Sequence, residues 1–200
     1  ASNLPTGLAM GSADGLITGT PAVAGVGSAT VYASNSYGVV STNLAFNIAK
    51  ASSSIRVTGT NSFTYNGNPQ GPVTLSQTGS SGAVTYSYAG TNGTLYSANA
   101  NKPTSAGEYT VVASVAADSN YGGAGSAPFS FAIAKAPLSV VGISIQDKEF
   151  DGTTTATITG TATYVGLQGT DNFAVAGTPT AAFTTPDVGA GKAVTVSGYA

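Results

Sequence analysis

The sequence contains no cysteine, no histidine and no tryptophan. Without Cys and His it has no thiolate nucleophile, no imidazole base, no disulfide framework and no zinc site of the usual kind. Charged residues make up 7% of the chain, and the net charge is −2. Nucleic-acid binding needs many Lys and Arg side chains to neutralise phosphates, so we expect no nucleic-acid partner. No apolar run is long enough to span a membrane, so we expect no membrane span.

The residues that are present favour folded β structure over disorder. The chain has 10 Tyr and 7 Phe, whereas disordered chains are poor in aromatic residues and carry a high net charge. From Tyr109 to Val115 apolar residues alternate with Thr and Ser, which places every second side chain on one face of a strand. On that face we expect Val111 to lie nearer the rim than Tyr109. The predicted strands are residues 55–57, 73–75, 84–88, 109–115, 129–133, 138–145, 173–176 and 193–197.

Turn residues separate these predicted strands. No segment long enough for a helix carries an apolar stripe at helical spacing. Pairs of Asp or Asn with Gly supply the positive φ that tight turns need. The pairs are Asp14-Gly15, Asn66-Gly67, Asn92-Gly93 and Asp151-Gly152. Short strands at this spacing are typical of antiparallel sandwiches, so the predicted fold class is all-β, with tandem immunoglobulin-like β-sandwich modules.

One motif recurs along the chain at a constant interval. A Pro, a few small residues and a Gly precede a Val- and Thr-rich strand three times, and the intervals Gly25 to Gly107 and Gly107 to Gly189 are equal. Such a long period indicates tandem domains. The predicted domains are residues 1–50, 51–135 and 136–200. We expect the first and last to be truncated, and the short Ala-Lys-Ala junctions to couple neighbouring domains stiffly.

Each predicted domain contains short motifs that resemble a known domain family. Leu4–Leu8 and Asp14–Pro21 resemble the immunoglobulin (cadherin-like) repeat. Tyr65–Gly67, Val84–Tyr88 and Ala106–Val111 resemble the MBG domain. Asp147–Thr154 and Gly189–Val196 resemble the YDG domain. Phe150 stands where the YDG family usually has Tyr. These are repeats of bacterial surface proteins, and the resemblance implies a segment of a large exported adhesin with no catalytic residues.

The function that follows from this resemblance is structural. It implies a non-catalytic stalk or spacer segment of a bacterial cell-surface protein, located outside the cell. Its partners would be neighbouring repeats of the same chain. Two alternatives stay open: a carbohydrate- or protein-binding module with a glycan or surface-protein ligand, and an accessory region of a secreted hydrolase.

The chemistry-bearing candidates lie in one acidic stretch. Asp147, Glu149 and Asp151 match the first half of a calcium loop, but the twelfth position, where a bidentate Glu should close the cage, is Ile158. Calcium is thus the one cofactor considered, and no catalytic residue is assigned. Acids on a strand followed by an Asp-Gly turn explain the same residues without a metal. An acid and base pair for glycoside cleavage is a further alternative, although it needs a pocket that raises one pKa.

Tyrosines and lysines give two more hypotheses. Tyr86 and Tyr88 share a strand face, and we favour core packing over sugar stacking for them. A lysine that forms an isopeptide bond with an Asn or Asp is an alternative that the sequence cannot test. The lysines considered are Lys50, Lys102, Lys135 and Lys192.

Overall fold

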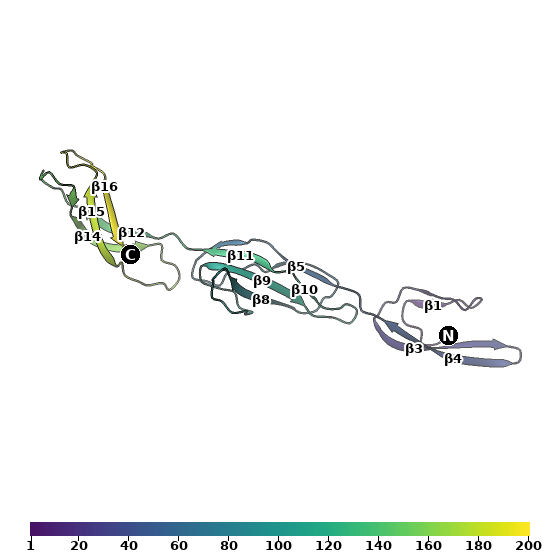
Figure 1. The fold of residues 1–200 in the computed structure, drawn as a ribbon. Coiled ribbons are helices and arrows are strands. Elements are labelled where there is room, and N and C mark those ends of the chain that lie inside the picture. The colour runs from purple at the N-terminus through teal and green to yellow at the C-terminus, as the bar shows by residue number, and fades with distance from the viewer. The chain divides into compact units, whose positions relative to one another are not determined.

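The computed structural model describes residues 1–200 and consists of strands joined by turns and loops (Figure 1). The strands are β1 (Leu8–Met10), β2 (Ile17–Gly19), β3 (Gly25–Asn35), β4 (Gly38–Ile48), β5 (Ser54–Thr58), β6 (Ser62–Thr64), β7 (Thr74–Thr78), β8 (Val84–Thr91), β9 (Gly107–Val115), β10 (Ala124–Gly125), β11 (Phe129–Ala134), β12 (Ser139–Ile145), β13 (Thr155–Ala156), β14 (Ile158–Val165), β15 (Gly177–Phe183) and β16 (Val194–Tyr199). The predicted all-β class is confirmed. The chain has no helix of the length and apolarity that a membrane crossing requires.

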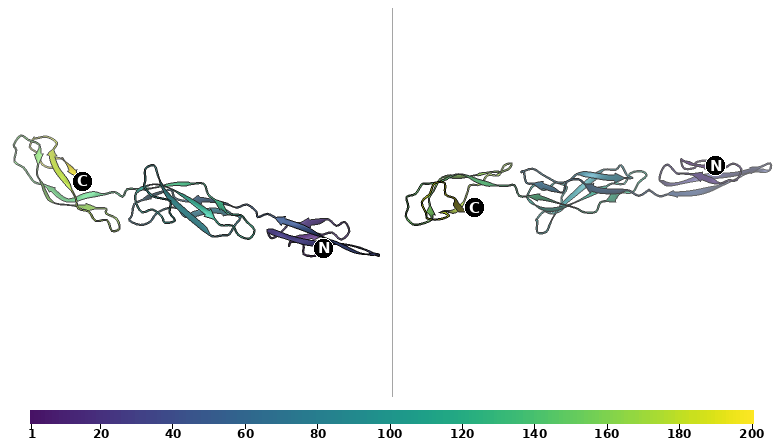
Figure 2. Two further views of the ribbon diagram at one scale, coloured as in Figure 1. Left: turned by 60° about the horizontal axis from the view of Figure 1, so that its bottom comes forward. Right: turned by 90° about the horizontal axis from the view of Figure 1, so that it is seen from above.

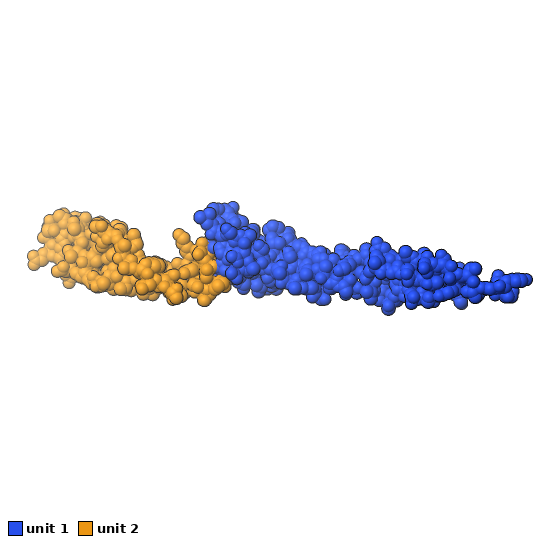
Figure 3. All heavy atoms as spheres, turned by 90° about the horizontal axis from the view of Figure 1, so that it is seen from below, with its two compact units in different colours: residues 1–63, 70–103, 107–132 blue, residues 64–69, 104–106, 133–200 orange.

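The chain forms two compact units (Figure 3). Unit 1 comprises residues 1–63, 70–103 and 107–132. Unit 2 comprises residues 64–69, 104–106 and 133–200. Two short segments of the predicted middle domain therefore group with the C-terminal third of the chain. The division into three sequence domains stays a prediction, because a repeat boundary and a compact unit are different properties.

A long hairpin forms about half of the first fifty residues (Figure 2). β3 and β4 pair antiparallel along their whole length, from Gly25 opposite Ile48 to Asn35 opposite Gly38. β1 and β2 form a second, shorter hairpin. It turns at the predicted Asp14-Gly15 pair, where Gly15 has a φ of 68°.

The middle of the chain holds the largest buried core. β6, β8, β9, β10 and β11 form one sheet, β5 and β7 form another, and β5 lies against β9. The buried side chains of β9 are Tyr109, Val111, Ala113 and Val115. The predicted alternation is therefore confirmed. The expected rim position of Val111 is wrong, since this side chain is 0% exposed beneath the facing sheet.

Unit 2 is built from two small sheets. β12 pairs with β14, and β15 pairs with both β13 and β16. The β12–β14 register shifts at Gly142, where φ is 83° and a Cβ would lie 2.4 Å from the Thr161 carbonyl oxygen. Only glycine fits such a position without strain. The core of the β13–β15–β16 sheet includes the small buried side chains of Ala156 and Ala181.

One predicted strand in unit 2 is wrong. Residues 173–176 were expected to be extended and paired, but the strand begins at Gly177. The Phe173 ring instead packs edge-on against Tyr164, with the ring centroids 5.5 Å apart. The Phe-Ala-Val-Ala pattern imitates strand alternation, but the segment is a loop in which the Phe173 ring contacts Tyr164.

Candidate functional site

The predicted acidic residues lie in a loop at one end of unit 2. This acidic loop (residues 146–153) follows β12 and carries Asp147, Glu149 and Asp151. Together with residues 183–192 it lines a groove of about 470 Å³. No three acidic side chains of the chain come close enough together to hold a metal ion.

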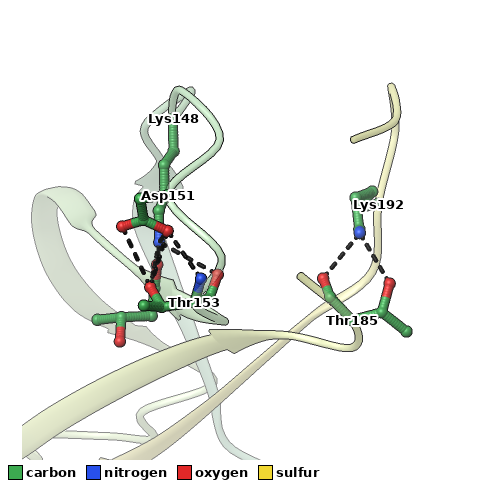
Figure 4. A network of polar contacts seen from close by, with 6 residues as sticks. Lys148, Asp151, Thr153, Thr185 and Lys192 are labelled. Atoms are coloured by element: carbon green, nitrogen blue, oxygen red, sulfur yellow. Dashed lines mark hydrogen bonds and ion pairs between the residues drawn. The ribbon is translucent and has the colours of Figure 1, made fainter. Parts of the chain in front are cut away.

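Asp151 is engaged within its own loop (Figure 4). Its carboxylate lies 2.7 Å from the Lys148 ammonium and accepts the Thr153 N–H at 2.9 Å. The hydrogen bond from Lys148, followed by that from the Thr153 backbone, holds the pKa of Asp151 at about 2. A general acid for glycoside cleavage needs a raised pKa, so this shift has the opposite sign. Lys148 also donates to the Thr155 carbonyl at 3.0 Å, which ties the loop to β13.

The loop of residues 184–192, on the other side of the groove, is braced in the same way by Lys192 (Figure 4). Its ammonium donates to the Thr185 carbonyl at 2.7 Å and to Thr185 Oγ1 at 2.9 Å, and it also donates to the Asp187 carbonyl. Each side of the groove is therefore a loop braced by one lysine. At its rim the side chains of Phe150 and Val188 are 68% and 85% exposed.

The tyrosines considered for sugar stacking lie in or against the core of unit 1. Tyr88 is 1% exposed and donates to the Pro72 carbonyl at 3.0 Å. Burial, with a smaller contribution from Tyr86, raises the pKa of Tyr88 to about 12. Tyr86 stacks on Tyr88 and donates to the Val73 carbonyl at 2.7 Å. The core interpretation is confirmed for Tyr88, which presents no exposed face to a sugar, whereas Tyr86 is half-buried.

A second set of contacts joins the end of the first predicted domain to the second, within unit 1. The side chain of Asn120 accepts the Ala24 N–H at 3.0 Å and donates to the Ala22 carbonyl at 3.2 Å. Next to it, the Ala51 N–H donates to the Asn120 carbonyl at 2.9 Å, and the Gly122 N–H donates to the Ala51 carbonyl at 2.8 Å. Residues 22–24 and 51 are thus both fastened to the loop of residues 118–122.

Asp118 gives this joint loop its shape. One carboxylate oxygen accepts the N–H groups of Asn120 and Tyr121, at 2.9 and 2.8 Å, and the other accepts the Ser81 N–H at 2.8 Å. The bond from Ser81, then that from Tyr121, holds the pKa of Asp118 at about 2. Lys50 donates to the Asp118 carbonyl. The Asn120 side chain is therefore aimed at its partners by a fixed turn.

A related contact lies within unit 2. The Tyr65 hydroxyl donates to Asp171 Oδ1 at 2.8 Å, and this bond is the largest cause of a raised Tyr65 pKa. The backbones of Gly67 and Gly169 also meet, since a Cβ on Gly67 would lie 2.8 Å from the Gly169 Cα. The turn 65–67 therefore packs directly on the loop of residues 166–171.

Two parts of the chain match family models. Residues 1–51 match the family described as "Putative Ig domain", and residues 134–200 match the YDG domain. These two segments are thus similar to an Ig-like domain and to a YDG domain. The expected resemblance to these two families is confirmed, whereas the MBG resemblance of the residues between them stays a prediction. No curated protein matches the chain.

The acidic loop and its groove lie in the segment that matches the YDG domain, and the Asn120 contacts join the segment that matches the Ig domain to the residues that follow it. Sequence reasoning found the acidic loop but missed the role of Asn120. The available signal was the repeated Tyr-Gly pair, at residues 37–38 and 121–122. Nothing in that pattern shows which backbone groups the neighbouring Asn binds.

Proposed function

We propose that this chain is a structural spacer segment of an exported bacterial surface protein. The observation that carries the proposal is the set of hydrogen bonds from residues 120–122 to residues 22–24 and 51, which we call the Asn120 joint. In this joint one loop binds two separate segments of the preceding Ig-like domain. Ig-like and YDG domains are consistent with a repeat of a surface protein. The segment acts outside the cell, and its partners are the neighbouring repeats of the same chain.

The mechanism of such a spacer is mechanical. Each hydrogen bond of the joint contributes about 0.5–1.5 kcal/mol net, so the two Asn120 side-chain bonds and the two backbone bonds to Ala51 restrict bending together. A joint of this kind transmits orientation from one domain to the next. The spacer therefore sets both the reach and the direction of whatever the parent protein carries.

The proposal includes the absence of a catalytic role. Ig-like and YDG families are generally non-enzymatic. In the groove of the YDG domain, Lys148 and Thr153 stabilise the ionised form of Asp151 rather than the protonated form that acid catalysis needs.

A ligand-binding module is the second candidate, and one observation favours it. The exposed Phe150 ring stands in the acidic loop between Glu149 and Asp151, and an aromatic face beside carboxylates suits a sugar. An accessory region of a secreted hydrolase would use the same groove, with its enzyme elsewhere in the parent protein.

A glycan array probed with the fluorescently labelled full chain separates these functions. A spacer gives no signal above the blank at any printed glycan. Saturable binding that Phe150→Ser abolishes, while the matched exposed substitution Phe173→Ser leaves it intact, would replace the spacer with a binding module. Both side chains are exposed, so neither substitution removes a buried core residue.

A further inference from the structure

Two faces of unit 2 are built from the same sequence elements. The covered face consists of the turn 65–67 and residues 104–106, and the open face consists of residues 146–153 and 184–192. Each face carries an aromatic residue, an Asn or Asp and a Gly in succession, Tyr65–Gly67 in one and Phe150–Gly152 in the other. The two glycines adopt the same left-handed conformation, with φ of 76° and 73°. Each face also has a segment from the Pro-to-Gly motif that precedes β9 or β16.

The covered face is occupied by a loop of the YDG domain. Residues 166–171, which follow β14, supply the Asp171 acceptor for Tyr65 and the Gly169 backbone against Gly67. Tyr65 and Ala106 are half-buried there. The covered face is thus a surface that binds a loop of the following domain, residues 166–171. We call the part of a domain that contacts the preceding domain its base.

The same positions of the open face have no cover. Phe150 and Val188, which correspond to Tyr65 and Ala106, are exposed, and a Cβ added to Gly152 would meet nothing within 4 Å. Lys148 and Lys192 nevertheless hold both loops in place. Two large apolar side chains therefore project from a preformed groove, and exposed apolar groups rimmed by polar ones mark interaction sites.

A loop of suitable construction lies in the first fifty residues. In unit 1 the joint loop binds residues 22–24 through the Asn120 side chain and residue 51 through the backbones of Asn120 and Gly122, and Asp118 Oδ1 holds the Tyr121 N–H at 2.8 Å. In the β3–β4 turn, Asn35 Oδ1 holds the Tyr37 N–H at the same 2.8 Å, ahead of Gly38. Tyr37 is 97% exposed. This turn has the same Tyr-Gly pair as the joint loop and a similar side-chain brace, with the acceptor two rather than three residues before the Tyr, but nothing covers it.

We propose that the open face is a docking site for the base of another repeat, and that a second copy of this chain binds there through its turn 35–38. The proposal rests on the proposed spacer function and names the surface through which spacers join. The Tyr37 ring packs on Phe150 and Val188, and the uncharged turn brings no like charge to a groove that carries four acidic and two basic residues. Contact between the open face of one copy and a different surface of the next is heterologous, so it builds rings or open filaments.

The absence of native cysteine makes a direct test simple, because a single engineered Cys takes a spin label at one site. A nitroxide at Ser34→Cys lies beside the turn and leaves the Asn35–Tyr37 bond in place. This labelled chain is mixed with an equal amount of ¹⁵N chain at about millimolar concentration, the range in which linked repeats meet each other. We expect broadening of the ¹⁵N amide signals of residues 149–153 and 187–190.

Three controls make the result specific. A nitroxide at the exposed Ser97→Cys should leave those amides sharp. Tyr37→Ser in the labelled chain and Phe150→Ser in the ¹⁵N chain should each weaken the association about tenfold, the effect of losing one buried aromatic contact. All three positions are exposed or half-exposed, and unchanged amide spectra elsewhere confirm folding.

Other outcomes overturn the docking site. They are an absence of broadening, broadening at other residues, or broadening that Phe150→Ser leaves unchanged. If any of these occurs while the glycan array stays blank and the Asn120 joint stays rigid, the docking site is rejected and the spacer function stands. A glycan that binds Phe150 would reject both.

Discussion

Replacement of Phe131 by Ala tests the core of the middle region most severely. The Phe131 ring is 4% exposed and packs on three other rings, with centroid distances of 5.4 Å to Tyr109, 6.0 Å to Phe63 and 6.1 Å to Tyr88. Loss of a buried Phe costs about 3–5 kcal/mol, since it removes burial and leaves a cavity. In a domain of this size about 4 kcal/mol lowers the melting temperature by roughly 15–30 °C.

The melting temperature can be followed by tyrosine fluorescence, because most of the ten tyrosines lie between residues 65 and 121 and the chain has no Trp. Phe129→Ala is the matched control, since Phe129 is half-buried on the same strand, and it should cost less than half as much. Phe131→Leu, which keeps most of the volume, should fall between them. Equal losses from Phe129→Ala and Phe131→Ala would refute the assignment of the core.

Three other predictions follow from the polar contacts and turns. Because hydrogen bonds hold the pKa of Asp118 and Asp151 at about 2, below the ordinary 3.8, the stability they contribute is complete above pH 4 and is lost as the pH falls towards 2. Asp118→Asn should remove part of that loss in an acid titration followed by circular dichroism, and an unchanged titration would contradict the role of Asp118. Millimolar calcium should leave the melting temperature and the amide shifts of the acidic loop unchanged, whereas a saturable shift would establish a calcium site. Gly67→Ala should destabilise the chain more than Gly152→Ala in urea unfolding, because φ is similar while only the Gly67 Cβ would meet Gly169; equal losses would argue against that contact.

The sequence predicted local features of the fold well. Alternation identified the buried face of β9, and the Asx-Gly pairs located positive φ at Gly15, Gly67, Gly93 and Gly152. These features depend on a few neighbouring residues, which is why a single sequence reveals them.

Features that depend on distant residues were predicted less well. The burial of Val111 is set by a facing sheet, and the loop conformation of Phe173 is accompanied by a contact with Tyr164. The Asn120 joint was missed for the same reason, since its partners are backbone groups of Ala22 and Ala24, which any sequence would supply.

The acidic loop illustrates the same limit at a candidate site. Spacing alone brought Asp147, Glu149 and Asp151 together as calcium ligands. In the structure Lys148, which stands between them in sequence, pairs with Asp151. An intervening residue of opposite charge was visible from the start, but only the loop geometry decides whether it reaches the carboxylate.

The stiffness of the Asn120 joint is the central claim, and a distance measurement between two spin labels tests it most directly. Ser28→Cys in β3 and Ser87→Cys in β8 place one label on each side of the joint, in a chain without other cysteines. We expect one narrow distance distribution, broadened by Asn120→Ala but not by Asn47→Ala, an exposed Asn on β4. A broad distribution in the unsubstituted chain would contradict the account.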